Sequence, residues 1–269
     1  MKNSSIEKVC RLIEKGKVIA LTGAGISVES GIPHFRGEDG LWSKYDPNIY
    51  ANVPGLLATF AASPGKIVEF IDEFYSVLFD AKPNPAHLAL AKMENNGVLD
   101  CVITQNIDNL HQDAGSNDVF ELHGNSYRLR CQKCQSKKNI SRDKLKDIVR
   151  QLRENKNSRI KLLKIFNRFF PKCSCGGRFR IDIVLFGEML PQDTVNESYR
   201  RLDNCDVVLL IGTSGVVYPA AGMPLLAKEK GAKLVEINTQ ESELSYLCDY
   251  QLFGKAGEVF KDLERVLKL

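Results

Sequence analysis

The chain has 269 residues, of which 43% are hydrophobic and 26% are charged, and its formal net charge is +4 at pH 7. These values exclude a disordered protein and predict a globular chain that can bury one large core and a smaller one. No apolar run approaches the ~20 residues that a helix needs to cross a bilayer, and the polar start at Met1 is unlike a signal peptide. We therefore expect a cytoplasmic protein, with nuclear entry left open.

Short apolar runs alternate with helical segments along the chain. Ser4 or Ser5 is suited to cap a first helix that ends at Gly16, and a buried strand follows over 18–22. Further strand-like runs cover 99–104, 119–122, 181–186, 207–211 and 234–237. This alternation predicts an α/β fold, with a Rossmann-like, mostly parallel sheet covered by helices on both faces.

Capping residues indicate the helices between these runs. Asn84-Pro85 opens a helix over 87–94, and further helices are expected over 220–230 and 257–267. Two inserts, over 31–83 and from about 127 to 180, interrupt the alternation. We expect these inserts to build a second, smaller domain.

The second insert contains two close pairs of cysteines. Four thiolates in two pairs can complete a tetrahedral zinc shell, although the long stretch between the pairs leaves four unrelated thiols as an alternative. Gly176 and Gly177 follow the second pair, as a tight knuckle requires, and favour zinc. Four sulfur ligands leave no open position for water, so we expect one structural zinc. The predicted ligands are Cys131, Cys134, Cys173 and Cys175.

Between the cysteine pairs, the segment 137–172 carries thirteen Lys or Arg against three acidic residues. Its helices also have an apolar face, so an ordinary solvated charged surface is one interpretation. A surface for an acidic partner or for nucleic acid is the other.

A glycine turn, Gly23-Ala24-Gly25, directly follows the first predicted strand. Such a turn lets the backbone approach a phosphate closely, and the following N–H groups and helix start are able to hold an anion. A third small residue is missing at Val28, and a turn used only for packing is an equal alternative. The glycines alone therefore do not decide the function.

Longer motifs point to a family. They are the run from Gly23 to Pro33, Phe35-Arg36, the run from Thr104 to His111, Leu122-His123-Gly124-Asn125, Phe186-Gly187-Glu188 and Gly212-Thr213-Ser214. In this order they resemble the sirtuin family of NAD-dependent protein deacylases, and the resemblance extends from about residue 5 to residue 268. The cysteine pairs lie where that family carries a zinc module.

The resemblance implies a reaction. In sirtuins the acyl-lysine oxygen displaces nicotinamide from NAD, and the acyl group then passes to a ribose hydroxyl, which gives O-acyl-ADP-ribose. The family makes His123 the base, and a histidine has the near-neutral pKa that this step needs. Asn106 and Asp108 would hold the nicotinamide and its ribose, with a turn or cap pair as the alternative. His87 and His111 are expected only to pack or hydrogen-bond within helices.

The resemblance also implies the NAD contacts. They come from the loops after predicted strands, where such folds bind dinucleotides, with Phe35 shielding the intermediate from water and Arg36 serving phosphate or ribose. The predicted set is Gly23, Ala24, Gly25, Ser27, Ile32, Phe35, Arg36, Gln105, Asn106, Ile107, Asp108, Gly212, Thr213, Ser214, Asn238, Thr239, Gln240 and Ala256.

In this family the substrate peptide pairs as a strand between two segments, so many acyl-lysine proteins are expected as partners. The predicted substrate contacts are Phe186, Gly187, Glu188, Val216, Val217 and Tyr75. Sirtuins that prefer acidic acyl groups carry Arg three positions after such a Tyr, whereas Leu78 stands here. An acyl carboxylate would lack its cation, so acetyl or longer apolar acyl groups are expected over succinyl or malonyl. His34 replaces the Asp of the most familiar members.

We divide the chain accordingly. A Rossmann-like NAD-binding domain comprises 1–30, 84–126 and 181–269; a helical insert with the cofactor loop covers 31–83; and a zinc-binding module with the basic segment covers 127–180. Two other functions stay open. One is a mono-ADP-ribosyltransferase or NAD hydrolase on the same scaffold, and the other is a non-catalytic module that binds zinc and nucleic acid.

Overall fold

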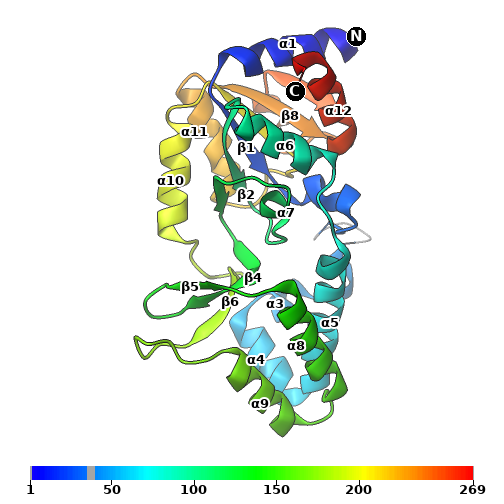
Figure 1. Cartoon of the computed structure of the whole chain (residues 1–269), viewed down its shortest axis with the longest axis vertical. Helices are drawn as coiled ribbons and strands as arrows, with labels where there is room; N and C mark the ends of the chain where they lie inside the picture. The colour runs from blue at the N-terminus through cyan, green and yellow to red at the C-terminus, as the bar shows by residue number, and fades with distance from the viewer. Residues whose placement is uncertain (1, 35–39, 269) are drawn as a thin grey trace. The chain divides into compact units, whose positions relative to one another are not determined.

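The computed structural model describes residues 2–34 and 40–268 (Figure 1). The chain divides into two compact units. The first unit comprises Met1–His34, Lys82–His123 and Leu190–Leu269, and the second comprises Phe35–Ala81 and Gly124–Met189. No helix in the described part of the chain is both long and apolar enough to pass through a membrane.

A six-stranded parallel sheet forms the centre of the first unit. Its strands are β1 (Val18–Thr22), β2 (Leu99–Thr104), β3 (Val119–Glu121), β7 (Val207–Ile211), β8 (Lys233–Asn238) and β9 (Tyr250–Phe253). The order across the sheet is β3-β2-β1-β7-β8-β9. The predicted α/β class and five of the predicted strands are confirmed, while β9 is an additional strand.

Helices cover both faces of this sheet, as predicted (Figure 1). Alternate side chains of β1 point to opposite faces: Val18 and Ala20 pack under one set of helices, and Ile19 and Leu21 under the other. The first face carries α1 (Lys2–Lys15), α6 (Pro85–Asn95) and α12 (Ala256–Leu267), and the second carries α10 (Gln192–Leu202) and α11 (Met223–Glu229). Shorter helical elements of this unit are η1 (Ala24–Ser30), α7 (Leu110–Asp113), η2 (Ala220–Gly222) and η3 (Ser245–Leu247).

Local capping explains one helix start and corrects another. Asn84 caps α6, because its side chain accepts a hydrogen bond from the Ala86 N–H and Pro85 occupies the first turn. By contrast, α1 begins at Lys2, so Ser4 and Ser5 lie inside the helix and do not cap it. Lysine is a good helix former, and the helix therefore continues past the serines toward the N-terminus.

The second unit contains a small antiparallel sheet and several helices. The sheet has the order β5-β4-β6, with β4 (Gly124–Cys131), β5 (Lys137–Asn139) and β6 (Phe179–Ile183). The apolar run at 181–186 therefore supplies a strand to this small sheet, not to the parallel one. The helices are α2 (Leu41–Lys44), α3 (Pro47–Tyr50), α4 (Val53–Ala62), α5 (Pro64–Asp80), α8 (Arg142–Glu154) and α9 (Arg159–Phe169).

The strand order reverses between β1 and β7. From β1 the chain continues outward through β2 and β3, whereas β7, β8 and β9 extend in the opposite direction. The loops that leave β1 and β7 thus diverge at their carboxyl ends, which is where open parallel sheets bind their ligands.

Candidate functional site

Two glycine loops meet at the point where the strand order reverses. The Gly25 N–H donates to the Gly212 carbonyl at 2.8 Å, and a Cβ placed on Gly25 would lie 2.6 Å from the Gly212 Cα. Gly212 itself has φ +58°, a conformation that favours glycine. Both glycines are thus required for the loops to approach each other, whatever ligand they hold. The segment after the turn, η1, is a seven-residue 3₁₀ helix rather than a long α-helix.

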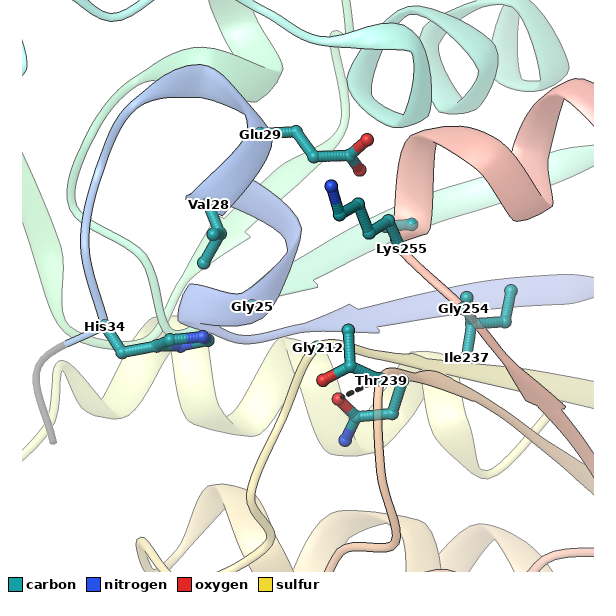
Figure 2. A pocket seen from close by; sticks show the side chains of 11 residues that line it. Gly25, Val28, Glu29, His34, Gly212, Ile237, Thr239, Gly254 and Lys255 are labelled. Atoms are coloured by element: carbon teal, nitrogen blue, oxygen red, sulfur yellow. Dashed lines mark hydrogen bonds between the residues drawn. The ribbon is translucent and has the colours of Figure 1, made fainter. Parts of the chain in front are cut away.

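A pocket opens above these glycines in the first unit (Figure 2). Five of its lining residues belong to the predicted NAD set: Gly25, Gly212, Asn238, Thr239 and Ala256. Six others were not predicted: Val28, Glu29, His34, Ile237, Gly254 and Lys255. The ends of β8 and β9 supply three of these, and the rule about carboxyl strand ends would have found Gly254 and Lys255 if β9 had been recognised.

Glu29 has a structural partner in this pocket. Its Oε2 accepts a hydrogen bond of 2.6 Å from the Gly257 N–H in the first turn of α12. A carboxylate at a helix N-terminus is stabilised by the helix dipole and by the free N–H groups there. Glu29 therefore joins η1 to the N-terminus of α12.

Asn106 and Asp108 are buried and hydrogen-bonded to the glycine loop. Asn106 Nδ2 donates to the Gly23 carbonyl and to Ser27 Oγ, both at 3.1 Å. Ser27 Oγ in turn donates to Asp108 Oδ2 at 2.7 Å. The loops that follow β1 and β2 are thereby joined by side chains from both.

Burial is the largest influence on the Asp108 carboxyl and raises its pKa above the usual range. The Leu110 N–H, which donates to Oδ1 at 2.9 Å, and the Ser27 hydroxyl act in the opposite direction. Each carboxyl oxygen of Asp108 thus has one hydrogen-bond donor from the protein. Each also keeps acceptor capacity for a ligand.

His123 is oriented by a backbone carbonyl. Its Nδ1 lies 2.9 Å from the Gln105 carbonyl oxygen, which can only accept, so Nδ1 carries the proton and Nε2 has the lone pair in the neutral ring. Burial lowers the pKa of His123, and the bond to Gln105 partly opposes that effect. The Gln105 side chain reaches the next loop, where its Nε2 donates to Thr213 Oγ1 at 3.0 Å. His123 is therefore mainly neutral at pH 7, with Nε2 available as a base.

The other predicted NAD residues of the first unit have varied surroundings. Asn238 Nδ2 donates to the Thr213 carbonyl at 3.1 Å, which links the loops after β7 and β8. Ser214, Thr239 and Gln240 are exposed. Ala24 is half-buried, and Ile32 and Ile107 are buried apolar residues. Phe35 and Arg36 lie outside the described residues.

The predicted substrate segments fall in different units. In the second unit, the Phe186 N–H donates to the Ala51 carbonyl at 2.7 Å, and Glu188 forms an ion pair with Arg180. Gly187 has φ +84°. In the first unit, Val216 is exposed and Val217 is half-buried.

Tyr75 is buried in the second unit. Its hydroxyl donates to the Ser126 carbonyl at 3.1 Å, and burial raises its pKa. Leu78, one turn further along α5, is also buried. The phenol is therefore neutral and fixed by the protein backbone.

The four predicted zinc ligands converge in the second unit. Their sulfur atoms all lie within 4.8 Å of one another, with 3.6 Å between the sulfurs of Cys131 and Cys175 and 3.7 Å between those of Cys134 and Cys173. Zinc–sulfur bonds of about 2.3 Å in a tetrahedron separate the sulfurs by about 3.8 Å, so the cluster fits zinc.

The predicted knuckle glycines are both required by the geometry of this cluster. Gly176 has φ +81°, and a Cβ on Gly177 would lie 2.8 Å from Cys131 Sγ. The Gly177 N–H also lies 3.4 Å from Cys175 Sγ, as a donor to a metal-bound thiolate does.

Comparison with known proteins gives concordant results. A family model described as the Sir2 family matches residues 23–219. A Pyrococcus abyssi (strain GE5 / Orsay) protein named NAD-dependent protein deacylase is 42% identical over 256 residues, 94% of this chain and 94% of that protein. A solved structure described as a Sir2 homolog–NAD complex has 41% identity and a TM-score of 0.77, covering 97% of this chain and 93% of that one. Another, described as Sir2–p53 peptide–NAD+, has 34% identity and a TM-score of 0.75, covering 97% of each chain.

Proposed function

This chain belongs to the Sir2 family, and we propose that it removes acyl groups from protein lysine side chains with NAD as its co-substrate. The observation that carries this proposal is the pairing of a carbonyl-anchored His123 with the buried Asn106–Ser27–Asp108 assembly. All four side chains belong to the first unit, at the carboxyl edge of the parallel sheet. A packing role alone gives no reason to bury the Asp108 carboxyl group or to orient the neutral imidazole of His123.

NAD supplies a ribose carbon that becomes electrophilic as nicotinamide leaves, and the acyl oxygen of the substrate attacks it. His123 Nε2 then accepts the proton of a ribose hydroxyl, since Nδ1 is held by the Gln105 carbonyl. The lowered pKa of His123 keeps this base neutral at pH 7. We infer that this hydroxyl oxygen then attacks the acyl carbon and that water completes the release of the lysine amine, so that O-acyl-ADP-ribose and the free lysine are the products.

Asp108 and Asn106 hold the nicotinamide end of NAD in this proposal. The Asp108 carboxylate keeps acceptor capacity for an amide N–H, because each of its oxygens has one hydrogen-bond donor among the described residues. Asn106 fixes the Gly23 carbonyl and Ser27, and with them the loop below the reacting carbon. Ile32 and Ile107 supply apolar surface that excludes water.

The pocket of Figure 2 takes the phosphates and adenosine. Gly25 and Gly212 present backbone without side chains, which allows an anion to approach closely. Asn238 and Thr239 offer polar groups at the end of β8, and Lys255 offers a cation at the end of β9. The pocket thus combines the donor types that a dinucleotide requires.

We further propose a preference for acetyl and longer apolar acyl groups over succinyl and malonyl. Tyr75 donates its hydroxyl to a backbone carbonyl of its own unit, and Leu78 stands where acid-preferring sirtuins carry Arg. A substrate carboxylate near these side chains would have no cation from this helix turn, and an unpaired buried charge is costly.

One experiment tests both proposals. Nicotinamide release and lysine exposure are measured in parallel on one peptide that carries acetyl-, succinyl- or myristoyl-lysine, with wild type and His123→Ala. Equal amounts of the two products that disappear in the variant support the deacylase. Nicotinamide without lysine exposure would instead indicate ADP-ribosyl transfer or NAD hydrolysis. A succinyl rate equal to the acetyl rate would refute the acyl preference.

The basic segment 137–172 carries a separate proposal about partners. On α8, Arg150 pairs with Asp147 and Glu154. Two carboxylates of α5 pair with the basic side chains at and just after the end of α8: Asp72 with Arg153, and Glu69 with Lys156. The next helix, α9, has no acidic residue. Among the described residues, no carboxylate forms an ion pair with its Lys161, Lys164 or Arg168. This helix therefore leaves uncompensated positive charge at the surface.

Two large apolar side chains lie among these cations. Ile160 and Leu163 are 70% and 46% exposed, one helical turn apart on α9. A phosphate backbone has little apolar surface to pack against such side chains. An acidic protein segment with apolar residues matches both the positive charge and the exposed apolar surface of α9. We therefore propose that α9 binds an acidic, amphipathic protein segment.

Fluorescence anisotropy tests this with a labelled peptide of alternating Glu and Leu residues and, in parallel, a 20-base-pair DNA duplex. We expect Lys161→Glu/Lys164→Glu to weaken peptide binding about tenfold at low salt. Lys261→Glu reverses an exposed charge on α12, away from α9 in the sequence, and is the control that should change little. Tight DNA binding without peptide binding would assign the surface to nucleic acid instead.

A further inference from the structure

Two buried histidines outside the proposed chemistry lie against each other beneath the site. His87 is on α6 and His111 on α7, and both side chains are essentially inaccessible to solvent. Their ring centroids are 4.9 Å apart with an interplanar angle of 57°. Burial lowers the pKa of His87 to about 4 and lowers that of His111 well below its ordinary value, so both rings are neutral at pH 7.

Each ring has one nitrogen with a hydrogen bond and one without. His87 Nδ1 accepts from the Asn84 N–H at 3.4 Å, and His111 Nε2 lies 3.0 Å from Thr22 Oγ1. Within the described part of the chain, His87 Nε2 and His111 Nδ1 have no hydrogen-bond partner. A buried polar atom without a partner destabilises the folded state, so this pair of atoms requires an explanation.

The protonation of His87 follows from its bonded nitrogen. A backbone N–H can only donate, so Nδ1 of the neutral His87 ring has the lone pair and Nε2 carries the proton. The unpartnered atom of His87 is therefore a donor. The unpartnered atom of His111 can be its acceptor, if His111 carries its proton on Nε2.

That same tautomer of His111 fits its other contact. Thr22 Oγ1 donates to Thr104 Oγ1 at 2.8 Å, so its own proton is used, and it must accept from His111 Nε2. A direct N–H···N bond of about 2.9 Å places two imidazole centroids about 5 Å apart, close to the observed 4.9 Å. Small ring rotations improve its alignment at little cost, because the outer torsion of histidine is broad.

We propose that His87 donates a hydrogen bond to His111, and that this bonded pair is a positioning device for Asn106. This proposal depends on the proposed function only in the role that it gives to Asn106. The bonds then run in one direction from α6 to the site: from the Asn84 N–H through both rings to Thr22 and on to Thr104. Thr104 Oγ1 also accepts from the Asn106 N–H at 3.0 Å, which fixes the backbone of the proposed nicotinamide-binding residue.

Both ends of this chain of bonds hold the glycine loop. At one end, Asn84 Nδ2 donates to the Ile26 carbonyl at 2.7 Å and to Ser30 Oγ at 3.0 Å. At the other end, Asn106 Nδ2 holds Gly23 and Ser27. The histidine pair thus joins the two groups of contacts that set the position of η1. His87 and His111 touch no substrate in this proposal and act through Asn84 and Asn106.

A spectroscopic signature tests the pair without any turnover. In ¹⁵N-histidine-labelled protein without NAD, we expect His87 and His111 to be neutral Nε2–H tautomers at pH 7, with scalar coupling between His87 Nε2 and His111 Nδ1 across the hydrogen bond. A ring packed only for its shape gives no such coupling. Absence of the coupling, or a proton on His111 Nδ1, would overturn the proposal.

The positioning role is tested with Thr22→Val, which keeps the side-chain shape and removes the hydroxyl. We expect kcat to fall about tenfold, the effect of roughly one hydrogen bond, with the peptide KM changed less than twofold. Ser198→Ala removes another buried hydroxyl, on α10 far along the chain from this pair, and should leave kcat unchanged. Equal effects of the two variants would overturn the positioning role. Wild-type protein that shows the coupling but no NAD turnover would overturn the proposed function alone.

Discussion

The buried histidines predict a specific sensitivity of the fold to acid. An unfolded histidine has a pKa near 6.5, whereas burial keeps His87 at about 4 in the folded chain. Between these values the unfolded state binds a proton that the folded state does not. Stability is therefore fully present above pH 6.5 and is lost as the pH falls below it.

The size of the effect follows from the two pKa values. Lowering the pH from 7 to 5 removes about 2 kcal/mol of unfolding free energy through His87 alone. Burial also lowers the pKa of His111 well below its ordinary value, so this ring changes stability in the same direction. A loss of about 2 kcal/mol is already a large part of the 5–15 kcal/mol that stabilises a typical domain.

Urea unfolding followed by far-ultraviolet circular dichroism at pH 7 and pH 5 measures this loss. The matched variant is His87→Gln, because glutamine at this helix position can still accept from the Asn84 N–H but does not titrate. Groups away from this pair change protonation equally in both proteins, and burial remains the largest influence on His111 in both. We therefore expect the variant to lose about 2 kcal/mol less than wild type between the two pH values. An equal loss in both proteins would refute the reasoning.

Three further predictions concern the site and the metal. Gly25→Ala places a Cβ against the Gly212 backbone, so NAD affinity measured by calorimetry should fall at least tenfold. Gly65→Ala is the control and should leave NAD affinity unchanged, because the nearest described atom to its Cβ is 3.6 Å away. In a pH profile of kcat/KM, activity should fall in acid with a midpoint below 6.5, since burial lowers the pKa of His123; a midpoint above 6.5 contradicts this assignment. A chelator should release one zinc per chain and unfold the second unit, which contains Trp42, the only tryptophan of the sequence. The tryptophan fluorescence should therefore change; unchanged fluorescence after metal loss would refute a structural role for zinc.

The sequence was sufficient to predict the central strands of the sheet because these are buried on both faces. All five residues of β1 and of β7 are buried, so each strand is a continuous apolar run. The edge strand β9 escaped prediction because Leu252 is its only buried residue. The run at 181–186 was found but assigned to the wrong sheet, because hydrophobicity shows that a strand exists and not which strand it pairs with.

The candidate site was predictable in its residue types and not in its orientations. The motifs include His123, but only the structure shows its Nδ1 against the Gln105 carbonyl, and that contact decides which nitrogen is the base. For the zinc ligands, two close cysteine pairs and two following glycines favoured zinc in the sequence, and the structure brings the four sulfurs together as predicted. His87 and His111 were expected to bond only within their helices, because 24 positions of sequence separate them and no local pattern pairs them.

These observations explain why so many side chains support the glycine loop. A long α-helix after the turn would present aligned N–H groups and a dipole to a bound anion. Here the turn leads into a 3₁₀ helix of seven residues, which presents fewer aligned N–H groups and a smaller dipole. The loop is held instead by donors from outside it: Asn84 bonds Ser30 at its far end, and Asn106 bonds Gly23 at its start. Removing one such donor should therefore displace the loop more than a surface substitution within η1 would.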